Sequence, residues 1–194
     1  MILFLDTVVR NKNRATFSAM VKFTHTLGAK HITGLPGVLH KENDPANNWE
    51  IAVEEATWRL NLCRQHEITY AIEAHVGSIL PDPKTTLRFL KDVPNLTLTL
   101  DYGHFIYQEM SNEDCHPLLP YASHFHARGG APGALQSTVP DNTIDFQNIV
   151  RHLKNAKYSG YYCLEYVWVD WENCNRTDNI SETLRLRDLL TGKS

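Results

Sequence analysis

The sequence predicts an α/β fold in which βαβ units build a parallel sheet. Short β-like runs alternate with amphipathic helix-like segments along the whole chain, which is typical of such units. The 194 residues are 42% hydrophobic, enough for one domain with a real core. No low-complexity tract or Pro/Ser-rich linker divides the sequence. We therefore expect a single domain over residues 1–194.

Six short β-like runs are the expected strands. The expected strands are Ile2–Leu5, His31–Thr33, Ile68–Ile72, Leu96–Leu100, Ala122–Phe125 and Tyr161–Leu164.

Five amphipathic segments are the expected helices, and the second has the clearest helical spacing of apolar residues. The expected helices are Ala15–Leu27, Trp49–Gln65, Lys84–Lys91, Asp145–Ala156 and Ser181–Leu190. Gly28 suits a helix C-terminus, and Asn179 with Glu182 resembles a capping box. Two long segments rich in Gly, Pro, Asn or Asp, Gly34–Asn48 and Gly129–Thr143, follow expected strands and favour active-site loops.

Charge and composition exclude several classes of protein. The formal charge of −3 argues against a nucleic-acid binder, which needs a basic surface. No apolar run approaches the roughly 18–20 residues of a membrane span, and the opening Met1–Leu5 run makes a poor signal peptide. The cysteines are scattered without a C-x-x-C pair, which is typical of reduced thiols in a cytoplasmic protein. They are Cys63, Cys115, Cys163 and Cys174.

Four expected strands end in a residue type that binds metals. These residues are Glu73, Asp101, His126 and Glu165. A carboxylate does not contribute to the packing of a strand of Leu and Ile. A buried charge without a partner lowers the stability of the fold by about 3–5 kcal/mol. The carboxyl ends of neighbouring parallel strands share one sheet edge, where β/α barrels hold their catalytic groups. A divalent cation there would neutralise the three carboxylates, with His126 as nitrogen ligand.

Polar residues close to these ligands are candidates for substrate binding. His75 follows Glu73 by two residues, and His104 follows Asp101 by three, with Gly103 allowing a tight backbone path. Arg128 opens a Gly-rich loop, where its fork of donors could hold a hydroxyl, carboxylate or phosphate.

Each residue taken alone has a simpler interpretation. A single Glu at a strand end is more often a neighbour of a helix N-cap or a surface residue. His124 and His126 alternate on one face, so one of them could be a hydrogen-bonded core imidazole. Arg128 could form a surface salt bridge. The functional interpretation depends on the four strand ends taken together.

From about Asp6 to its end, the chain resembles the xylose isomerase-like superfamily of sugar (phosphate) isomerases and epimerases. The resemblance is carried by four segments in this order: Ala71-Ile72-Glu73-Ala74-His75, Leu98-Thr99-Leu100-Asp101-Tyr102-Gly103-His104, His124-Phe125-His126-Ala127-Arg128 and Tyr158-Ser159-Gly160-Tyr161-Tyr162-Cys163-Leu164-Glu165-Tyr166. Members are TIM-type (β/α) barrels that hold Mn²⁺, Mg²⁺, Co²⁺ or Zn²⁺ through Glu, Asp, His and Glu. The resemblance implies one divalent metal ion on Glu73, Asp101, His126 and Glu165.

The resemblance also implies a reaction. The ion polarises the carbonyl of a ketose or aldose, and Glu73 and Glu165 move a proton through an enediolate. His104 and Arg128 position the substrate and stabilise the developing oxyanion. The expected function is a metal-dependent sugar isomerase or epimerase. The alternatives are a non-catalytic metal- or sugar-binding remnant of the barrel and an apurinic endonuclease-like metal hydrolase, which the charge disfavours.

The sequence departs from the family pattern in two ways. Arg128 stands near the position where related barrels often have an acidic residue, so substrate specificity does not carry over. The chain also shows six β/α units where a full barrel has eight, so we expect an incomplete barrel lacking the first two. The Ile2–Leu5 and Tyr161–Leu164 strands would then be open edges, and we expect a homodimer that covers them.

Overall fold

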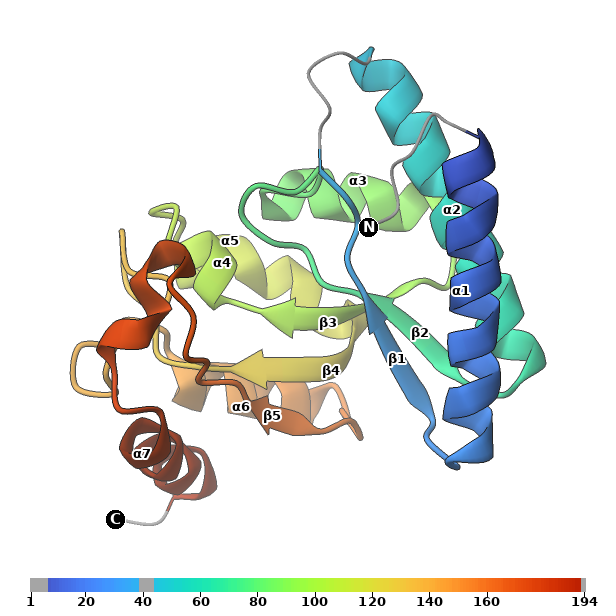
Figure 1. The fold of residues 1–194 in the computed structure, drawn as a ribbon. Coiled ribbons are helices and arrows are strands. Elements are labelled where there is room, and N and C mark those ends of the chain that lie inside the picture. The colour runs from blue at the N-terminus through green and yellow to red at the C-terminus, as the bar shows by residue number, and fades with distance from the viewer. Residues whose placement is uncertain (1–6, 39–43, 193–194) are drawn as a thin grey trace. The chain divides into compact units, whose positions relative to one another are not determined.

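A computed structural model describes residues 7–38 and 44–192 (Figure 1). The chain divides into two compact units, Met1–Leu98 and Thr99–Ser194. The expected Ile2–Leu5 strand lies outside the described residues.

The first unit has the predicted alternation of helices and parallel strands. In chain order it holds α1 (Thr7–Thr26), β1 (His31–Gly34), α2 (Pro45–Gln65), β2 (Thr69–Ile72), α3 (Pro83–Asp92) and the start of β3 (Thr97–Asp101). β1 pairs with β2 in parallel, with Ile32 beside Tyr70, and β2 pairs with β3 in parallel, with Ile72 beside Leu98. The predicted parallel βαβ units are confirmed.

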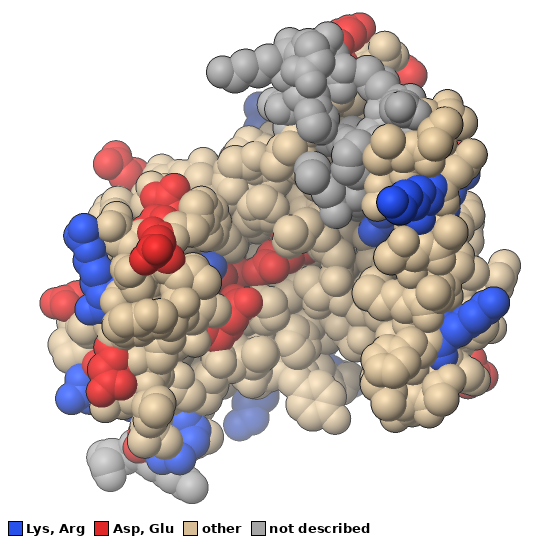
Figure 2. All heavy atoms as spheres, in the orientation of Figure 1, with Lys and Arg blue, Asp and Glu red and all other residues tan. Residues whose placement is uncertain are grey.

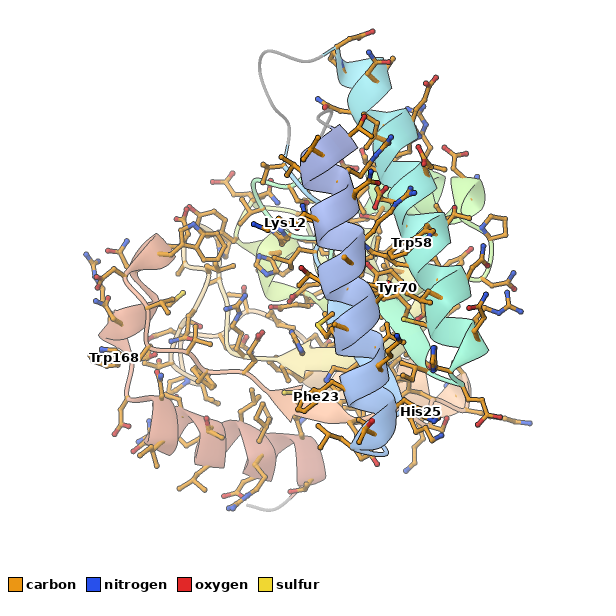
Figure 3. All side chains as sticks on the ribbon, turned by 45° about the vertical axis from the view of Figure 1, so that its right-hand side comes forward. Lys12, Phe23, His25, Trp58, Tyr70 and Trp168 are labelled. Atoms are coloured by element: carbon orange, nitrogen blue, oxygen red, sulfur yellow. The ribbon has the colours of Figure 1, made fainter. Side chains whose placement is uncertain are left out.

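Aromatic packing joins α1 to β2 in the core of the first unit. Phe17 of α1 is buried, and its ring lies 5.6 Å from that of Tyr70 and 6.0 Å from that of Trp58 on α2. Figure 3 labels Tyr70 and Trp58 beside α1. Burial of two or more such side chains contributes about 1.5–3 kcal/mol each, which fixes β2 beneath the helices.

The ends of α1 and α2 follow known helix-capping rules. Gly28 has a φ of +72° and donates its N–H to His25, so the predicted C-terminus of α1 is confirmed. The Gly34–Asn48 loop prediction is wrong at its far end, because α2 begins at Pro45. The Asp44 carboxylate accepts the N–H of Ala46, and proline suits the first helical position.

The second unit continues the same plan with additional short helices. It holds the end of β3, α4 (Gly103–Ile106), α5 (Asn112–Cys115), the 3₁₀ helix η1 (His116–Tyr121), β4 (Ala122–Ala127), α6 (Phe146–Asn155), β5 (Tyr162–Leu164), the 3₁₀ segment η2 (Trp171–Arg176) and α7 (Asn179–Thr191). β3 neighbours β4 in the sheet, and β4 pairs with β5 in parallel, with His126 beside Cys163. The four short helices were not predicted, because one or two turns leave no apolar period.

The predicted capping box at α7 is wrong by one residue. The side chain of Asp178, not Asn179, accepts the N–H groups of Ile180 and Ser181. The Glu182 carboxylate instead accepts the N–H of Val139 at 2.6 Å. Glu182 therefore ties α7 to the Gly129–Thr143 loop rather than closing its own helix end.

No helix among the described residues is long and apolar enough to pass through a bilayer. On the visible face of the second unit, acidic and basic side chains are interspersed (Figure 2).

Candidate metal site at the ends of the strands

Asp101, the last residue of β3, is buried and ionised at the centre of a polar cluster in the second unit. Its Oδ1 accepts the N–H of Gly103 at 2.7 Å, and its Oδ2 lies 2.8 Å from Nη2 of Arg128. Burial alone would raise the pKa of this carboxyl, but the nearby Arg128 and His104 and the Gly103 N–H hold it below its ordinary value. Asp101 is therefore a charged oxygen donor at neutral pH.

Arg128 follows β4 directly and lies in the interior of the second unit. Its side chain is 4% exposed, and Nη2 lies 3.1 Å from Nε2 of His104. Nε2 of His104 is in turn 3.6 Å from Asp101 Oδ2. Arg128 therefore does form a salt bridge, but its partner is the buried Asp101 and the pair does not lie on the surface.

His126 and Glu165 meet at the ends of β4 and β5. Nδ1 of His126 lies 3.0 Å from Oε2 of Glu165. The N–H of Glu165 donates to the carbonyl of Ala127 at 2.9 Å, which continues the parallel pairing of β4 and β5 by one step. Because the register is fixed by these strands, the imidazole and the carboxylate are placed by backbone rather than by a flexible loop.

The second unit supplies side chains of the types that bind divalent cations. Oδ2 of Asp101 and Oε2 of Glu165 are buried and accept no hydrogen bond from the residues that the structure describes. Each oxygen does have an ion-pair neighbour, Arg128 at 2.8 Å from Asp101 and His126 at 3.0 Å from Glu165, and a cation would give a carboxylate oxygen a further partner. Two carboxylates and one imidazole suit Mg²⁺, Mn²⁺, Co²⁺ or Zn²⁺.

Glu73 and His75 belong to the first unit. Glu73 follows β2 directly, and its N–H donates to the carbonyl of Gly34 at 3.0 Å, so it occupies the expected strand end. Nδ1 of His75 lies 2.7 Å from the carbonyl of Val76, and its backbone N–H donates to Oγ of Ser78. Their roles stay predictions.

Two residues outside the predicted site share its sheet face. His124 lies two residues before His126 on β4, and Cys163 is the register partner of His126 on β5. One ligand atom from each of the three lies within 4.8 Å of the others. Burial lowers the pKa of His124, and the neighbouring His126 lowers it further. The alternation His124-Phe125-His126 signalled the shared face, but the neighbouring cysteine required the β4–β5 register.

The loop after Arg128 is braced against the segment after β5. The hydroxyl of Tyr166 accepts the N–H of Gly129 at 3.0 Å and donates to the carbonyl of Ser137 at 3.1 Å. A Cβ on Gly129 would lie 2.6 Å from that hydroxyl, so this position requires glycine. The amide of Gln136 donates to the carbonyls of Val167 and Cys174. The predicted loop is therefore a fixed wall beside Arg128.

A cavity of about 540 Å³ also lies in the second unit, lined by Trp168 and residues 175–180. Trp168, labelled in Figure 3, is largely exposed. The lining residues do not include Asp101, His126 or Glu165, so this cavity is separate from the strand ends.

Parallel βαβ units with ligand-type residues after successive strands are typical of the TIM-barrel class of proteins. The family described as "Xylose isomerase-like TIM barrel" matches residues 3–189. The chain belongs to this family, and its fold is a TIM-type barrel that is incomplete over the described residues. The expected superfamily and fold class are confirmed.

Solved structures with the same fold share little sequence with the chain. An L-ribulose 3-epimerase has 16% identity and a TM-score of 0.79, over 99% of this chain and 70% of that one. The IOLI protein, crystallised with a zinc atom, has 17% identity and a TM-score of 0.76, over 98% and 73%. A Mycobacterium smegmatis protein of the same barrel type, in complex with magnesium, has 17% identity and a TM-score of 0.72, over 98% and 71%. No curated protein sequence matches the chain.

Proposed function

We propose that the protein is a metal-dependent isomerase or epimerase of a sugar or sugar phosphate. The observation that carries the proposal is the placement of Asp101, His126 and Glu165 at or beside the ends of β3, β4 and β5, where Nδ1 of His126 lies 3.0 Å from Oε2 of Glu165. Membership of the xylose isomerase-like family and fold similarity to an L-ribulose 3-epimerase support the sugar chemistry.

Asp101, His126 and Glu165 would hold one divalent ion, with Glu73 as the fourth ligand on the ground of its strand-end position. Neighbouring structures contain magnesium and zinc, which supports an ion of this group. When bound, the ion supplies Lewis-acid polarisation of the substrate carbonyl.

The proton transfer is assigned to the carboxylates. Glu165 removes a proton from the carbon next to the carbonyl, and Glu73 returns one to the enediolate. His126 lies 3.0 Å from Glu165 and orients its carboxylate. His104, Arg128 and His75 are proposed to position the substrate hydroxyls, and the positive charge of Arg128 to stabilise the developing oxyanion.

The metal site is tested by calorimetry with Mn²⁺ and Zn²⁺. Asp101→Ala removes a buried charged oxygen and should abolish high-affinity binding, whereas Asp114→Ala removes an exposed carboxylate and should leave it intact. Unchanged affinity in Asp101→Ala would show that Asp101 is not a ligand.

The reaction is tested by turnover of a panel of ketoses and ketose phosphates in D₂O with added Mn²⁺. Glu165→Gln keeps the shape of the side chain but removes the base, so deuterium incorporation should fall by about 10²-fold or more. Glu113→Gln, at an exposed position on α5, is the matched control. Wild-type incorporation in Glu165→Gln would rule out the base. No turnover by the wild-type protein, with metal bound, would favour the non-catalytic remnant.

We also propose a homodimer, as expected from the sequence. Its original basis, the Ile2–Leu5 strand, lies outside the described residues, but α1 supplies separate support. Met20, Phe23 and Leu27 follow a helical spacing and are exposed, and Phe23 is visible on α1 in Figure 3. Light scattering at micromolar concentration should give twice the 22.2 kDa chain mass, and Phe23→Glu should lower it. A wild-type monomer would refute the homodimer.

The cysteines support a cytoplasmic location. All four are free thiols, and three of them are buried. The substrate, in this proposal, is a small sugar rather than a nucleic acid or a membrane lipid.

A further inference from the structure

We propose that His124, His126 and Cys163 form a second metal position that takes thiophilic divalent ions such as Zn²⁺ and competes with the carboxylate site for His126. The position lies entirely within the second unit. Its three side chains come from β4 and β5 alone.

The strand pairing brings the three side chains to one face. His124 and His126 are two residues apart on β4, so they point to the same side of the sheet. β5 runs parallel to β4 with Cys163 in register with His126. The two imidazole rings lie 5.3 Å apart at 83° to each other. A thiol thus stands beside two imidazoles on adjacent strands.

The spacing of the ligand atoms is close to that of a metal site. One nitrogen from each histidine and Sγ of Cys163 lie within 4.8 Å of one another. A tetrahedral zinc ion with bonds of about 2.0–2.3 Å needs ligand atoms roughly 3.3–3.8 Å apart. A side-chain movement of about one ångström or less would bring the atoms to this spacing. None of the three side chains is fully buried, so an ion can reach them.

The chemistry of the ligands selects the ion. Thiolate and imidazole prefer Zn²⁺ over Mg²⁺ and Mn²⁺, which favour carboxylate oxygens. On binding, Cys163 releases its proton to solvent and becomes a thiolate ligand. Three protein ligands leave a fourth position for water.

The shared imidazole links this position to the carboxylate site. His126 contacts Glu165 at 3.0 Å and is also the register partner of Cys163. In this proposal, an ion held by His124 and Cys163 would occupy the same imidazole that an ion on Asp101 and Glu165 would use. Zinc should therefore inhibit an enzyme activated by Mn²⁺. This inhibitory consequence rests on the proposed function, whereas the metal position itself does not.

The position is tested with Co²⁺ alone, because a cobalt–thiolate bond gives a near-ultraviolet charge-transfer band that oxygen and nitrogen ligands do not. Titration of the wild-type protein should produce this band. Cys163→Ser should abolish it, and His124→Gln should weaken Co²⁺ binding by about tenfold or more. Cys115→Ser, at a buried thiol on α5 whose hydrogen bond to Ser111 serine can keep, is the control and should retain the band.

Asp101→Ala separates the two proposals. This variant should keep the charge-transfer band even if it loses the carboxylate site. Absence of the band from the wild-type protein, its persistence in Cys163→Ser, or its loss in Asp101→Ala would each overturn the second position.

Inhibition is the second readout. With Mn²⁺ present, added Zn²⁺ should inhibit the wild-type enzyme, and Cys163→Ser should need about tenfold more Zn²⁺ or higher. Equal inhibition of both proteins would show that Zn²⁺ acts elsewhere. If the wild-type protein shows no turnover, the proposed function is contradicted, but the cobalt titration still tests the second metal position.

Discussion

Removal of the Arg128 guanidinium should destabilise the protein through the charge it leaves behind on Asp101. Arg128 Nη2 lies 2.8 Å from Asp101 Oδ2, and the two side chains are 4% and 1% exposed. Arg128→Met keeps the length of the side chain but removes its charge. Breaking a buried ion pair from one side costs about 3–5 kcal/mol. Because Asp101 keeps the hydrogen bond from the Gly103 N–H, we expect about 3 kcal/mol, the lower end of this range.

The assay is urea denaturation in the presence of a chelator, so that no metal ion replaces the lost charge. The double variant Asp101→Asn/Arg128→Met carries neither charge and should be more stable than Arg128→Met alone. Added Mn²⁺ should then stabilise Arg128→Met more than the double variant, because only the former keeps Asp101 as a charged ligand. A loss below about 0.5 kcal/mol in Arg128→Met, or a double variant no more stable than the single one, would refute the reasoning.

Three further predictions follow from contacts elsewhere in the chain. Gln136→Leu leaves buried carbonyls in the segment after β5 without their donor, and urea denaturation should show a loss of about 1–3 kcal/mol; an unchanged midpoint would contradict this. Asp82→Ala removes the carboxylate that accepts the N–H of Thr85 at the start of α3. The free energy of unfolding should fall by about 1 kcal/mol, and a thermal midpoint equal to the wild-type value would contradict this. Burial raises the pKa of Cys63 to about 11 and that of Cys115 to about 12, so each holds less thiolate at pH 8 than an ordinary thiol. Mass spectrometry after brief thiol labelling at pH 8 should find both unmodified in the native protein and modified in urea; rapid native labelling would refute their burial.

The helices and strands were predictable where the apolar period was long. The helix expected at Trp49–Gln65 ends at Gln65 in the structure, and its buried positions repeat every three or four residues from Asn48 to Cys63. The helix begins earlier than the apolar period indicates, because Asp44 caps it and Pro45 opens its first turn. The short α4 and α5 helices gave no signal, because four residues are too few to show a period.

The sequence predicts which candidate site residues lie at strand ends, but not which side chains they contact. Asp101 and Glu165 stand at or just after the ends of β3 and β5, as the sequence predicts. The pairing of Asp101 with Arg128 joins residues 27 positions apart, and no local pattern encodes it. The sequence indicates only that Cys163 is a reduced thiol, since the β4–β5 register is what places it beside His126.

Arg128 also changes what kind of substrate the site would favour. The cluster in the second unit has two carboxylates, Asp101 and Glu165, and one guanidinium, which leaves one net negative charge with neutral histidines. An acidic residue in place of Arg128, as the family resemblance implies for related barrels, would make the cluster more negative by two charges. With a dication bound and Glu73 as the proposed fourth ligand, the site would be neutral, whereas the acidic version would carry two negative charges. A negative, partly desolvated site repels anions more strongly than a neutral site does. In the proposed function, Arg128 would therefore let the site accept a sugar phosphate or sugar acid that the acidic version would repel.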